Sequence, residues 1–288
     1  MDPSTFLQFF VNGVLQGCIY ALAALGLTLI FGVYHFVNLA HGFFIMLAAY
    51  LVLQLCWWGV TPILACIIAT ILVVLVGFLA YLLGFSRLFG ASFLAQIVSS
   101  FGLAIIIENS LSLIWKSDVK VIHILSGAIS IGNVMLPISR ITSAIFSVAA
   151  TLLFFLMLSK TRLGKAIRAV SQDPEGASLL AVNVNFIRMI SFIISCALAG
   201  FAGTLLGQVS AFAPHDGHLW TFRAFAIAQL GGLGSFTGAI IGGLIIGLLE
   251  SFSVLWISAG YVDAIFFGAL LVMVLLRPTG ILGVGRTR

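Results

Sequence analysis

Three polar side chains stand at helical spacing near the start of the chain, in a stretch that is otherwise apolar. Asn12, Gln16 and Tyr20 are four residues apart, which places them on one face of a helix. A polar stripe costs free energy where it faces lipid, so it should face protein or water. The sequence leaves two roles open: hydrogen bonding between helices, or the lining of a path for a polar solute.

Three further residues are predicted to lie on such a path. Asn38 and His41 begin the next apolar run, where free N–H groups and the helix dipole suit a carboxylate or carbonyl group. A plain capped helix end, with Asn38 as N-cap, is the alternative. Glu108 lies in an apolar run without Lys or Arg, and a carboxylate inside a membrane span is a functional candidate because its burial is costly. Three roles are open for Glu108: a neutral acid, an ionised group paired with another helix, or a contact for a substrate ammonium group. Glu250 is better interpreted as structural.

Sequence patterns for catalysis and metal binding are missing. The chain has no GxSxG, HExxH or GxxxxGKS/T motif, and its four cysteines lack the spacing of a zinc site or a disulfide framework. His215, Asp216 and His218 cluster in a loop, but three loop residues do not predict a metal site. We therefore expect no enzymatic activity on this chain, and an ATP-driven role requires the ATPase to be another chain.

The elements that must position these residues follow from composition. Hydrophobic residues make up 62% of the 288 residues and charged residues only 7%, against roughly 25% charged residues in soluble domains. We predict one all-α polytopic membrane domain over residues 1–288, with about 8 transmembrane helices around a central path, some of them broken or re-entrant. The predicted spans are residues 6–31, 36–57, 62–85, 93–115, 141–159, 188–212 and 260–277, with a glycine-rich region 223–258 that crosses twice or is broken partway.

Small residues are predicted to pack these helices closely. A small residue at every fourth position lets a second helix approach, and the residues predicted from this pattern are Ser195, Gly203, Gly207, Gly238 and Gly242. The polar turns Asn38–Gly42 and Gly234–Gly238 each open an apolar helix, and paired broken helices of this kind are typical of transporters.

Two longer segments separate the spans. Residues 160–188 carry seven of the chain's 13 basic and 8 acidic side chains, and the excess of Lys and Arg places loop 160–187 in the cytoplasm. Segment 116–140 is then periplasmic, with a small β-hairpin predicted from Val119–Ile124 and the glycine-containing turns that follow. The N-terminus with Asp2 is placed outside. The same rule places the C-terminus inside, with Arg277, Arg286 and Arg288.

The charged loop is predicted to form two short helices. Residues 163–171 form the first, with Lys165 and Arg168 on its polar side. Asp173 opens the second as N-cap, followed by Pro174 at the first helical position. Charge held in water between membrane spans favours docking of a soluble partner, and a basic loop lying on the membrane surface is the alternative.

The same loop resembles a known family. Arg162–Ala169, Asp173 and Ala177–Leu180 are similar to the inner-membrane permeases of branched-chain amino acid importers of the ATP-binding-cassette class, above all to the shorter, LivH-type permease. Further motifs agree in family order over nearly the whole chain: Asn12–Leu22 continuing to Asn38–Gly42, Leu230–Ser235 with Gly238 and Gly242, and Arg277–Gly283. Two positions depart from the family pattern: Ala181 stands where Gly is common, on what we expect to be a helix, and Glu108 stands where Gln or another polar residue is common.

The resemblance implies a permease subunit in the bacterial inner membrane that moves branched-chain or other hydrophobic amino acids, or related small amides and acids, by alternating access. The implied partners are a second homologous permease, two cytoplasmic ATPases that bind the ATP, and a periplasmic binding protein, with no cofactor on this chain and no nucleic acid. The residues implied to dock on an ATPase are Gly164, Lys165, Arg168, Asp173, Glu175 and Ala177. A stand-alone channel or secondary transporter for a small polar solute is the alternative, but ion coupling should need more paired ionisable residues within the spans.

Overall fold

A computed structural model describes residues 3–88, 91–122, 127–131, 134–256, 261–277 and 279–283. Its elements are α1 (Pro3–Tyr34), α2 (His41–Trp57), α3 (Pro62–Leu83), the 3-10 turn η1 (Phe85–Arg87), α4 (Phe93–Trp115), β1 (Ala128–Ile131), β2 (Val134–Pro137), α5 (Ile138–Lys160), α6 (Arg162–Gln172), α7 (Pro174–Leu179), α8 (Val184–Leu206), α9 (Asp216–Gly231), α10 (Phe236–Trp256) and α11 (Val262–Leu276). Among the described residues, six helices are long and apolar enough to cross a membrane, and the shorter apolar helices α2 and α11 accompany them. The predicted all-α polytopic class is therefore confirmed.

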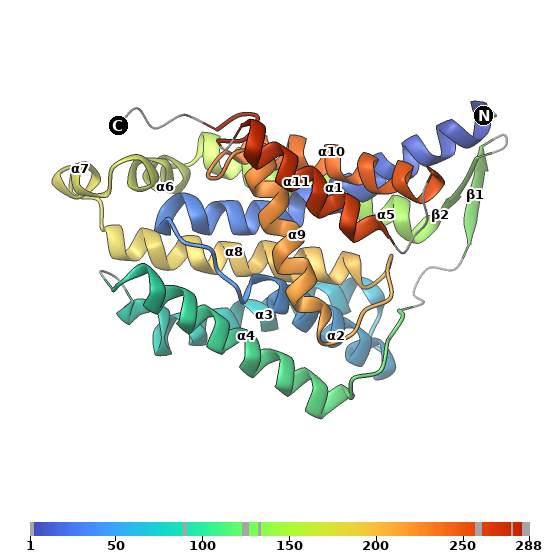
Figure 1. Ribbon diagram of the computed structural model, residues 1–288. Coiled ribbons are helices and arrows are strands. Elements are labelled where there is room, and N and C mark those ends of the chain that lie inside the picture. The colour runs from blue at the N-terminus through green and yellow to red at the C-terminus, as the bar shows by residue number, and fades with distance from the viewer. Residues whose placement is uncertain are drawn as a thin grey trace.

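Helix α1 runs through the middle of the bundle (Figure 1). It has 32 residues, which makes it about 48 Å long, and every residue from Ile19 to Ile30 is buried, as expected for a helix surrounded by others. Helices α5, α8, α9 and α10 pack around it. Glycine allows the closest approach: a Cβ on Gly17 would lie 2.8 Å from Leu244 Cα of α10.

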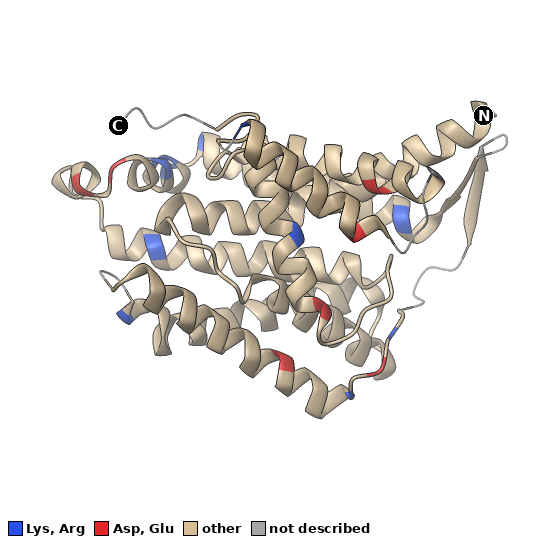
Figure 2. Cartoon of the chain, viewed as in Figure 1, with Lys and Arg blue, Asp and Glu red and all other residues tan. Residues whose placement is uncertain are grey.

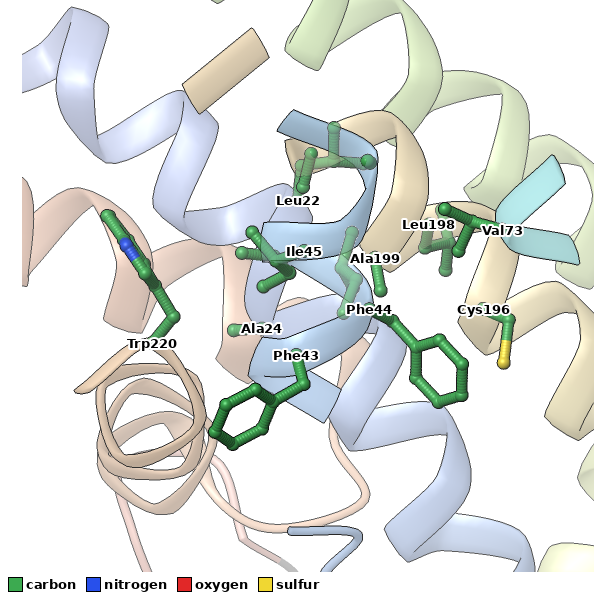
Figure 3. Packing of buried hydrophobic residues seen from close by; sticks show 14 of the residues in the cluster. Leu22, Ala24, Phe43, Phe44, Ile45, Val73, Cys196, Leu198, Ala199 and Trp220 are labelled. Carbon is green, nitrogen blue, oxygen red and sulfur yellow. The ribbon is translucent and has the colours of Figure 1, made fainter. Parts of the chain in front are cut away.

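The apolar core lies where α2, α8 and α9 meet α1. Figure 3 shows two neighbouring phenylalanines of α2 pointing in different directions, Phe43 on the side of Trp220 in α9 and Phe44 toward Cys196 in α8. Both rings are fully buried, and Phe44 meets the ring of Phe192 edge-on at 6.5 Å. The two rings therefore fix α2 against α8 and α9 at once.

Helix α2 begins inside the bundle rather than at its end. The imidazole Nε2 of His41, the first residue of α2, lies 2.9 Å from the carbonyl oxygen of Ala23, about three helical turns before the end of α1. Residues 35–40 therefore return into the bundle before α2 starts. The predicted span 36–57 is wrong at its start for this reason, whereas the prediction that the turn Asn38–Gly42 opens a helix is confirmed.

The glycine-rich region 223–258 is broken, as predicted. Residues 232–235 separate α9 from α10. Gly232 and Gly234 take positive φ angles of 107° and 83° there, a backbone conformation that glycine adopts without a Cβ clash. The turn Gly234–Gly238 thus opens α10, which confirms the second of the two predicted helix starts.

A segment near the C-terminus completes this break. The backbone N–H groups of Ile281 and Leu282 donate to the carbonyl oxygens of Leu230 and Gly231, at 2.9 and 3.0 Å. The last carbonyls of a helix have no partner within the helix. Residues 279–283 therefore cap the C-terminal end of α9.

The two ends of the bundle differ. Helices α6 and α7 lie at one end with the end of α1 and residues 279–283, while the start of α1 and the β1–β2 hairpin lie at the other (Figure 1). Figure 2 shows few charged residues along the helices, with Lys and Arg concentrated toward the end that carries α6 and α7. The predicted positions of Asp2, Arg286 and Arg288 lie outside the described residues, as do residues 123–126 and 132–133.

Two further boundaries differ from prediction because distant segments pair. The hairpin forms later than predicted, with residues 128–131 paired to residues 134–137. Lys120, in the predicted strand region, pairs instead with Phe212, through backbone bonds of 2.8 and 3.0 Å. The predicted span 188–212 also ends early, at Leu206, because the chain leaves the helix to reach Lys120.

Candidate functional site

The polar face of α1 meets a charged cluster that extends from the hairpin end of the bundle to the middle of α1. Arg140 Nη1, at the start of α5, donates to Asn12 Oδ1 at 3.0 Å. The Tyr20 hydroxyl donates to the carboxylate of Glu250 in α10. Arg223 Nη1 of α9 donates to the same hydroxyl oxygen at 3.3 Å. The stripe predicted from the sequence thus brings together side chains from four helices.

Arg223 has several partners in this cluster. Its Nη2 donates to Asp263 Oδ1 of α11 at 2.6 Å, and its guanidinium carbon lies 5.1 Å from the centre of the Trp220 ring and 5.9 Å from that of Phe266. The Arg223 side chain is only 11% exposed. A carboxylate and ring faces stabilise a cation held this far from water, so Arg223 ties α9 to α1 and α11.

A cavity of about 250 Å³ lies beside the cluster, between α1, α5 and α10. Its wall includes polar and apolar side chains: Asn12, Gln16, Arg140, Glu250, Phe9 and Val254. Two of the predicted path residues, Asn12 and Gln16, therefore line the cavity. The third member of the stripe, Tyr20, contacts the wall through Glu250.

Asn38 and His41 lie elsewhere, in the interior of the bundle. Both side chains are buried. Asn38 Oδ1 accepts from the N–H of Ala40 at 3.1 Å, and Ala40 itself is the N-cap of α2, so Asn38 shapes the turn before the helix. The start of α2 faces α9, where Gly42 N donates to Thr221 Oγ1 at 2.9 Å. Asn38 Nδ2 and His41 Nδ1 have no hydrogen-bond partner among the described residues.

Glu108 occupies a third location, on α4. Its carboxylate lies 3.1 Å from His218 Nε2 of α9, and the ring of Phe43 meets that imidazole edge-on at 4.7 Å. Of the alternatives for Glu108, the structure shows pairing across helices. His215 Nε2 lies 3.6 Å from Asp216 Oδ1, and within the described residues no group of three or more His, Cys, Asp or Glu side chains is placed to hold a metal ion.

At the opposite end of the bundle, α6 and α7 form a two-helix element with a cap at each start. Thr161 Oγ1 accepts from Gly164 N at 3.0 Å. Asp173 Oδ1 accepts from the backbone N–H groups of Glu175 and Gly176, at 3.1 and 3.0 Å. These side chains satisfy donors that a helix start leaves free. The predicted pair of short helices is confirmed.

The residues predicted to dock on a partner divide into two groups. Gly164 and Ala177 are buried, and a Cβ on Gly164 would lie 2.3 Å from the carbonyl oxygen of Leu158. Gly164 therefore seats α6 on the end of α5. The exposed group, which a partner can touch, consists of Lys165, Arg168, Asp173 and Glu175.

Ser171 joins this element to α1. Its hydroxyl donates to the carbonyl oxygen of Gly32, in the last turn of α1, at 2.6 Å. A Cβ on Gly32 would also lie 3.7 Å from Gly234 Cα in the break between α9 and α10. Helix α6, the end of α1 and the break therefore meet at one point.

The end of α7 departs from the sequence expectation. Ala181 was expected on a helix, but it follows α7 with a φ of 60°. Val182 N and Ala181 N donate to the carbonyl oxygens of Ala177 and Ser178, at 3.1 and 3.0 Å. These two bonds form a helix-ending turn in which glycine is the favoured residue, so the expectation that alanine is accommodated on a helix is wrong.

The predicted small residues lie at close contacts between helices of this chain. Ser195 Oγ of α8 donates to the carbonyl oxygen of Gly26 in α1 at 2.7 Å. A Cβ on Gly203 of α8 would lie 2.0 Å from the carbonyl oxygen of Ile45 in α2. A Cβ would likewise meet another atom at 3.0, 2.1 and 2.6 Å on Gly207, Gly238 and Gly242.

Sequence reasoning missed the charged partners of the α1 stripe. No motif singles out Arg140, Arg223 or Asp263, and Glu250 is interpreted as structural. Their shared signal is an ionisable side chain within or at the edge of an apolar run. Their convergence carries no sequence pattern, because α5, α9, α10 and α11 each supply one of them.

Comparisons with known proteins match nearly the whole chain. Residues 9–275 match the family model described as branched-chain amino acid transport system / permease component. The high-affinity branched-chain amino acid transport system permease protein BraD of Pseudomonas aeruginosa is 35% identical, over 96% of each chain. The permease proteins LivH of the same kind of system from Salmonella typhimurium and Escherichia coli are 33% identical, over 96% of each chain. No solved structure matches this chain.

Proposed function

The chain belongs to the family of permease components of branched-chain amino acid transport systems, and we propose that it carries branched-chain or other hydrophobic amino acids inward as one permease subunit of an ATP-driven importer. The pore opens alternately to the two sides of the bacterial inner membrane, and ATP is bound and hydrolysed by separate ATPase subunits. The alternative of a stand-alone channel or secondary transporter is not favoured, because the relatives are permease components of transport systems.

The observation that carries this proposal is the exposed α6–α7 element. Capping by Thr161 and Asp173 stabilises the start of each helix, and the buried residues Gly164 and Ala177 hold the two short helices against their neighbours. Lys165 and Arg168 are exposed, whereas Gly164, Ile167 and Val170 of the same helix are buried. A rigid, charged element of this kind suits a groove on a soluble ATPase.

In this proposal the α6–α7 end faces the cytoplasm and the hairpin end faces the periplasm. The excess of Lys and Arg near α6 favours this orientation. Arg277, at the end of α11, fits it as well. Helices α9, α10 and α11 follow α8 in turn, and residues 279–283, which follow α11, lie at the α6–α7 end (Figure 1).

The cavity beside α1 is the candidate for the outer part of the substrate path. It lies at the hairpin end, where a periplasmic binding protein would deliver substrate. Asn12 and Gln16 line it, while Asn38, His41 and Glu108 lie elsewhere and stay predictions as substrate contacts. A second homologous permease and two ATPases complete the proposed assembly.

Reversal of one exposed charge tests the proposal. Arg168→Glu should lower the amount of ATPase that co-elutes with the affinity-tagged permease by about tenfold or more, because it places the wrong charge in a docking surface. The bundle should stay folded, since Arg168 is exposed. The measurement is quantitative mass spectrometry of the complex purified from native membranes in mild detergent, together with its thermal stability.

A matched control is Arg87→Glu, which makes the same change at an exposed arginine outside α6 and α7. This variant should keep its ATPases. Wild-type levels of ATPase and of amino acid uptake in Arg168→Glu would reject the docking role of α6. A wild-type permease that purifies without any ATPase, under conditions that preserve other importers of this class, would reject the importer itself.

A further inference from the structure

The cavity beside α1 carries two opposite charges that the protein does not pair. Arg140 on α5 and Glu250 on α10 both stand on its wall, and both are half-buried. Arg140 donates to the neutral amide of Asn12, and Glu250 accepts from the neutral hydroxyl of Tyr20. Among the described residues, neither charge has an ion-pair partner.

Two such charges on one cavity wall favour a ligand that carries both opposite charges. A charge withdrawn from water is costly unless a counter-charge and hydrogen bonds compensate it. The neighbouring Arg223 is already paired with Asp263 at 2.6 Å, which leaves Arg140 and Glu250 available. The formal charges of Arg140, Glu250, Arg223 and Asp263 sum to zero. A zwitterion has no net charge either, so its binding leaves the site neutral.

We propose that this cavity is a subsite for the charged end of an α-amino acid, in which Arg140 binds the carboxylate and Glu250 binds the ammonium group. A guanidinium forms paired hydrogen bonds with a carboxylate, and a carboxylate accepts from an ammonium group. Tyr20 holds Glu250 in place through its hydroxyl. The amide oxygen of Gln16, which has no hydrogen-bond partner among the described residues, offers the ammonium group a second acceptor.

The size and lining of the cavity agree with this ligand class. Its volume of about 250 Å³ equals the liquid volume of roughly eight water molecules, which is the scale of one amino acid. Phe9 and Val254 add apolar surface to the wall, which suits an aliphatic side chain. The inference rests on the proposed function for the role of the site in transport, whereas the binding itself is tested separately.

A phospholipid headgroup with a primary ammonium group carries the same pair of charges, so the experiment must separate the two sources. The permease is reconstituted with its partner permease and ATPases in nanodiscs of phosphatidylcholine, which has no primary ammonium group. Equilibrium binding of radiolabelled leucine is measured without the binding protein. Two analogues compete: 3-methylbutylamine, which lacks the carboxylate, and 4-methylpentanoate, which lacks the ammonium group.

The wild type should bind leucine more tightly than either analogue. Arg140→Gln should weaken leucine binding by about ten- to hundredfold, the usual effect of losing hydrogen bonds to a charged group, and should remove the preference for leucine over 3-methylbutylamine. Glu250→Gln should remove the preference for leucine over 4-methylpentanoate. A purely structural role for either residue would weaken all three ligands together. Arg140→Lys, which keeps the charge, should retain part of the preference.

Two control variants remove the same charges at exposed residues outside the cavity, Arg87→Gln and Asp118→Asn, and they should bind leucine as the wild type does. Unchanged preferences in both cavity variants would overturn the proposal, as would a wild type that binds no leucine. If phosphatidylethanolamine displaces leucine from the wild type but not from Arg140→Gln, the site belongs to lipid, and the proposal is overturned.

Normal leucine uptake by both cavity variants, once binding protein and ATP are added, would refute the subsite alone. Absence of branched-chain amino acid uptake by the wild type would refute the proposed function.

Discussion

The hairpin end and the α6–α7 end of the bundle differ in how their charged side chains are placed: the first partly buries them and bonds them to side chains of other helices, and the second exposes them. In the charged cluster that reaches from the hairpin end to the middle of α1, Arg223 is 11% exposed and bonded to Asp263 and Tyr20, and the cluster is drawn from five helices. At the other end, Lys165 and Arg168 are exposed on a single continuous segment. The difference teaches that a site with fixed geometry needs several helices to hold it, whereas a docking surface needs one firmly seated element. Helix α1 belongs to both regions, through Tyr20 near its middle and Gly32 in its last turn.

The largest effect is expected where the hairpin-end cluster loses its best-connected cation. Arg223→Leu leaves the carboxylate of Asp263 without its partner and removes the donor to the Tyr20 hydroxyl, and breaking a buried pair costs about 3–5 kcal/mol. Because Asp263 is 51% exposed, we expect a smaller loss of about 2–3 kcal/mol in unfolding free energy. Thermal unfolding of the purified protein measures it.

Two variants sharpen this first prediction. Arg87→Leu removes an exposed arginine at the opposite end and should leave the melting temperature nearly unchanged. The double change Arg223→Leu with Asp263→Leu should recover part of the stability, because it removes both charges. A melting temperature of Arg223→Leu equal to that of Arg87→Leu would show that the cluster is not what ties α9, α10 and α11 to α1.

A smaller effect is expected at the joint between the two regions. Ser171→Ala removes the 2.6 Å hydrogen bond from α6 to the end of α1, worth about 1 kcal/mol. The ATPases should still bind, since the exposed face of α6 is unchanged. Transport per ATP hydrolysed should fall by roughly fivefold or less, the factor that corresponds to 1 kcal/mol, in vesicles that contain the complete importer.

Ser178→Ala is the matched control for that joint. Ser178 is exposed on α7, and among the residues that the structure describes its hydroxyl bonds only to the carbonyl oxygen of Glu175, within its own helix. It should transport as the wild type does. If Ser171→Ala keeps the wild-type ratio of transport to ATP hydrolysis, the bond to Gly32 does not carry motion between the two ends.

The smallest effect is expected at the end of α7, and its sign is opposite. Ala181 has a φ of 60°, a backbone conformation that costs alanine about 1–2 kcal/mol. Glycine avoids this cost, but it lowers the stability by about 0.4–1 kcal/mol because it makes the unfolded chain more flexible. Ala181→Gly should therefore stabilise the protein by about 0.5–1 kcal/mol. Ala166→Gly, inside α6, should destabilise it by a similar amount. Equal melting temperatures of the two variants would contradict the assigned backbone conformation.

The sequence predicts the α6–α7 end well because its rules are local. Asp173 and Pro174 predict a helix start from two adjacent residues. The exposed positions of Lys165 and Arg168 follow from the helical period alone. Most membrane helices are predicted for the same reason, since an apolar run is continuous along the chain.

The hairpin-end cluster is not predictable in this way. The sequence indicates the stripe of Asn12, Gln16 and Tyr20, but not its partners Arg140 and Glu250, which lie on helices far along the chain. The start of α2 and the early end of α8 are missed for the same physical reason, because contacts with distant segments decide both boundaries.

The cap on α9 has a consequence for the order in which this protein matures. Residues 281 and 282 supply the N–H groups that close the end of α9, yet the ribosome makes α10 and α11 first, and chains fold from the N-terminus as they emerge. During synthesis the last carbonyls of α9 therefore lack these two donors until α10 and α11 have been made and have entered the membrane. A nascent chain arrested before Ile281 should accordingly be open to quality-control proteases at the α9–α10 break.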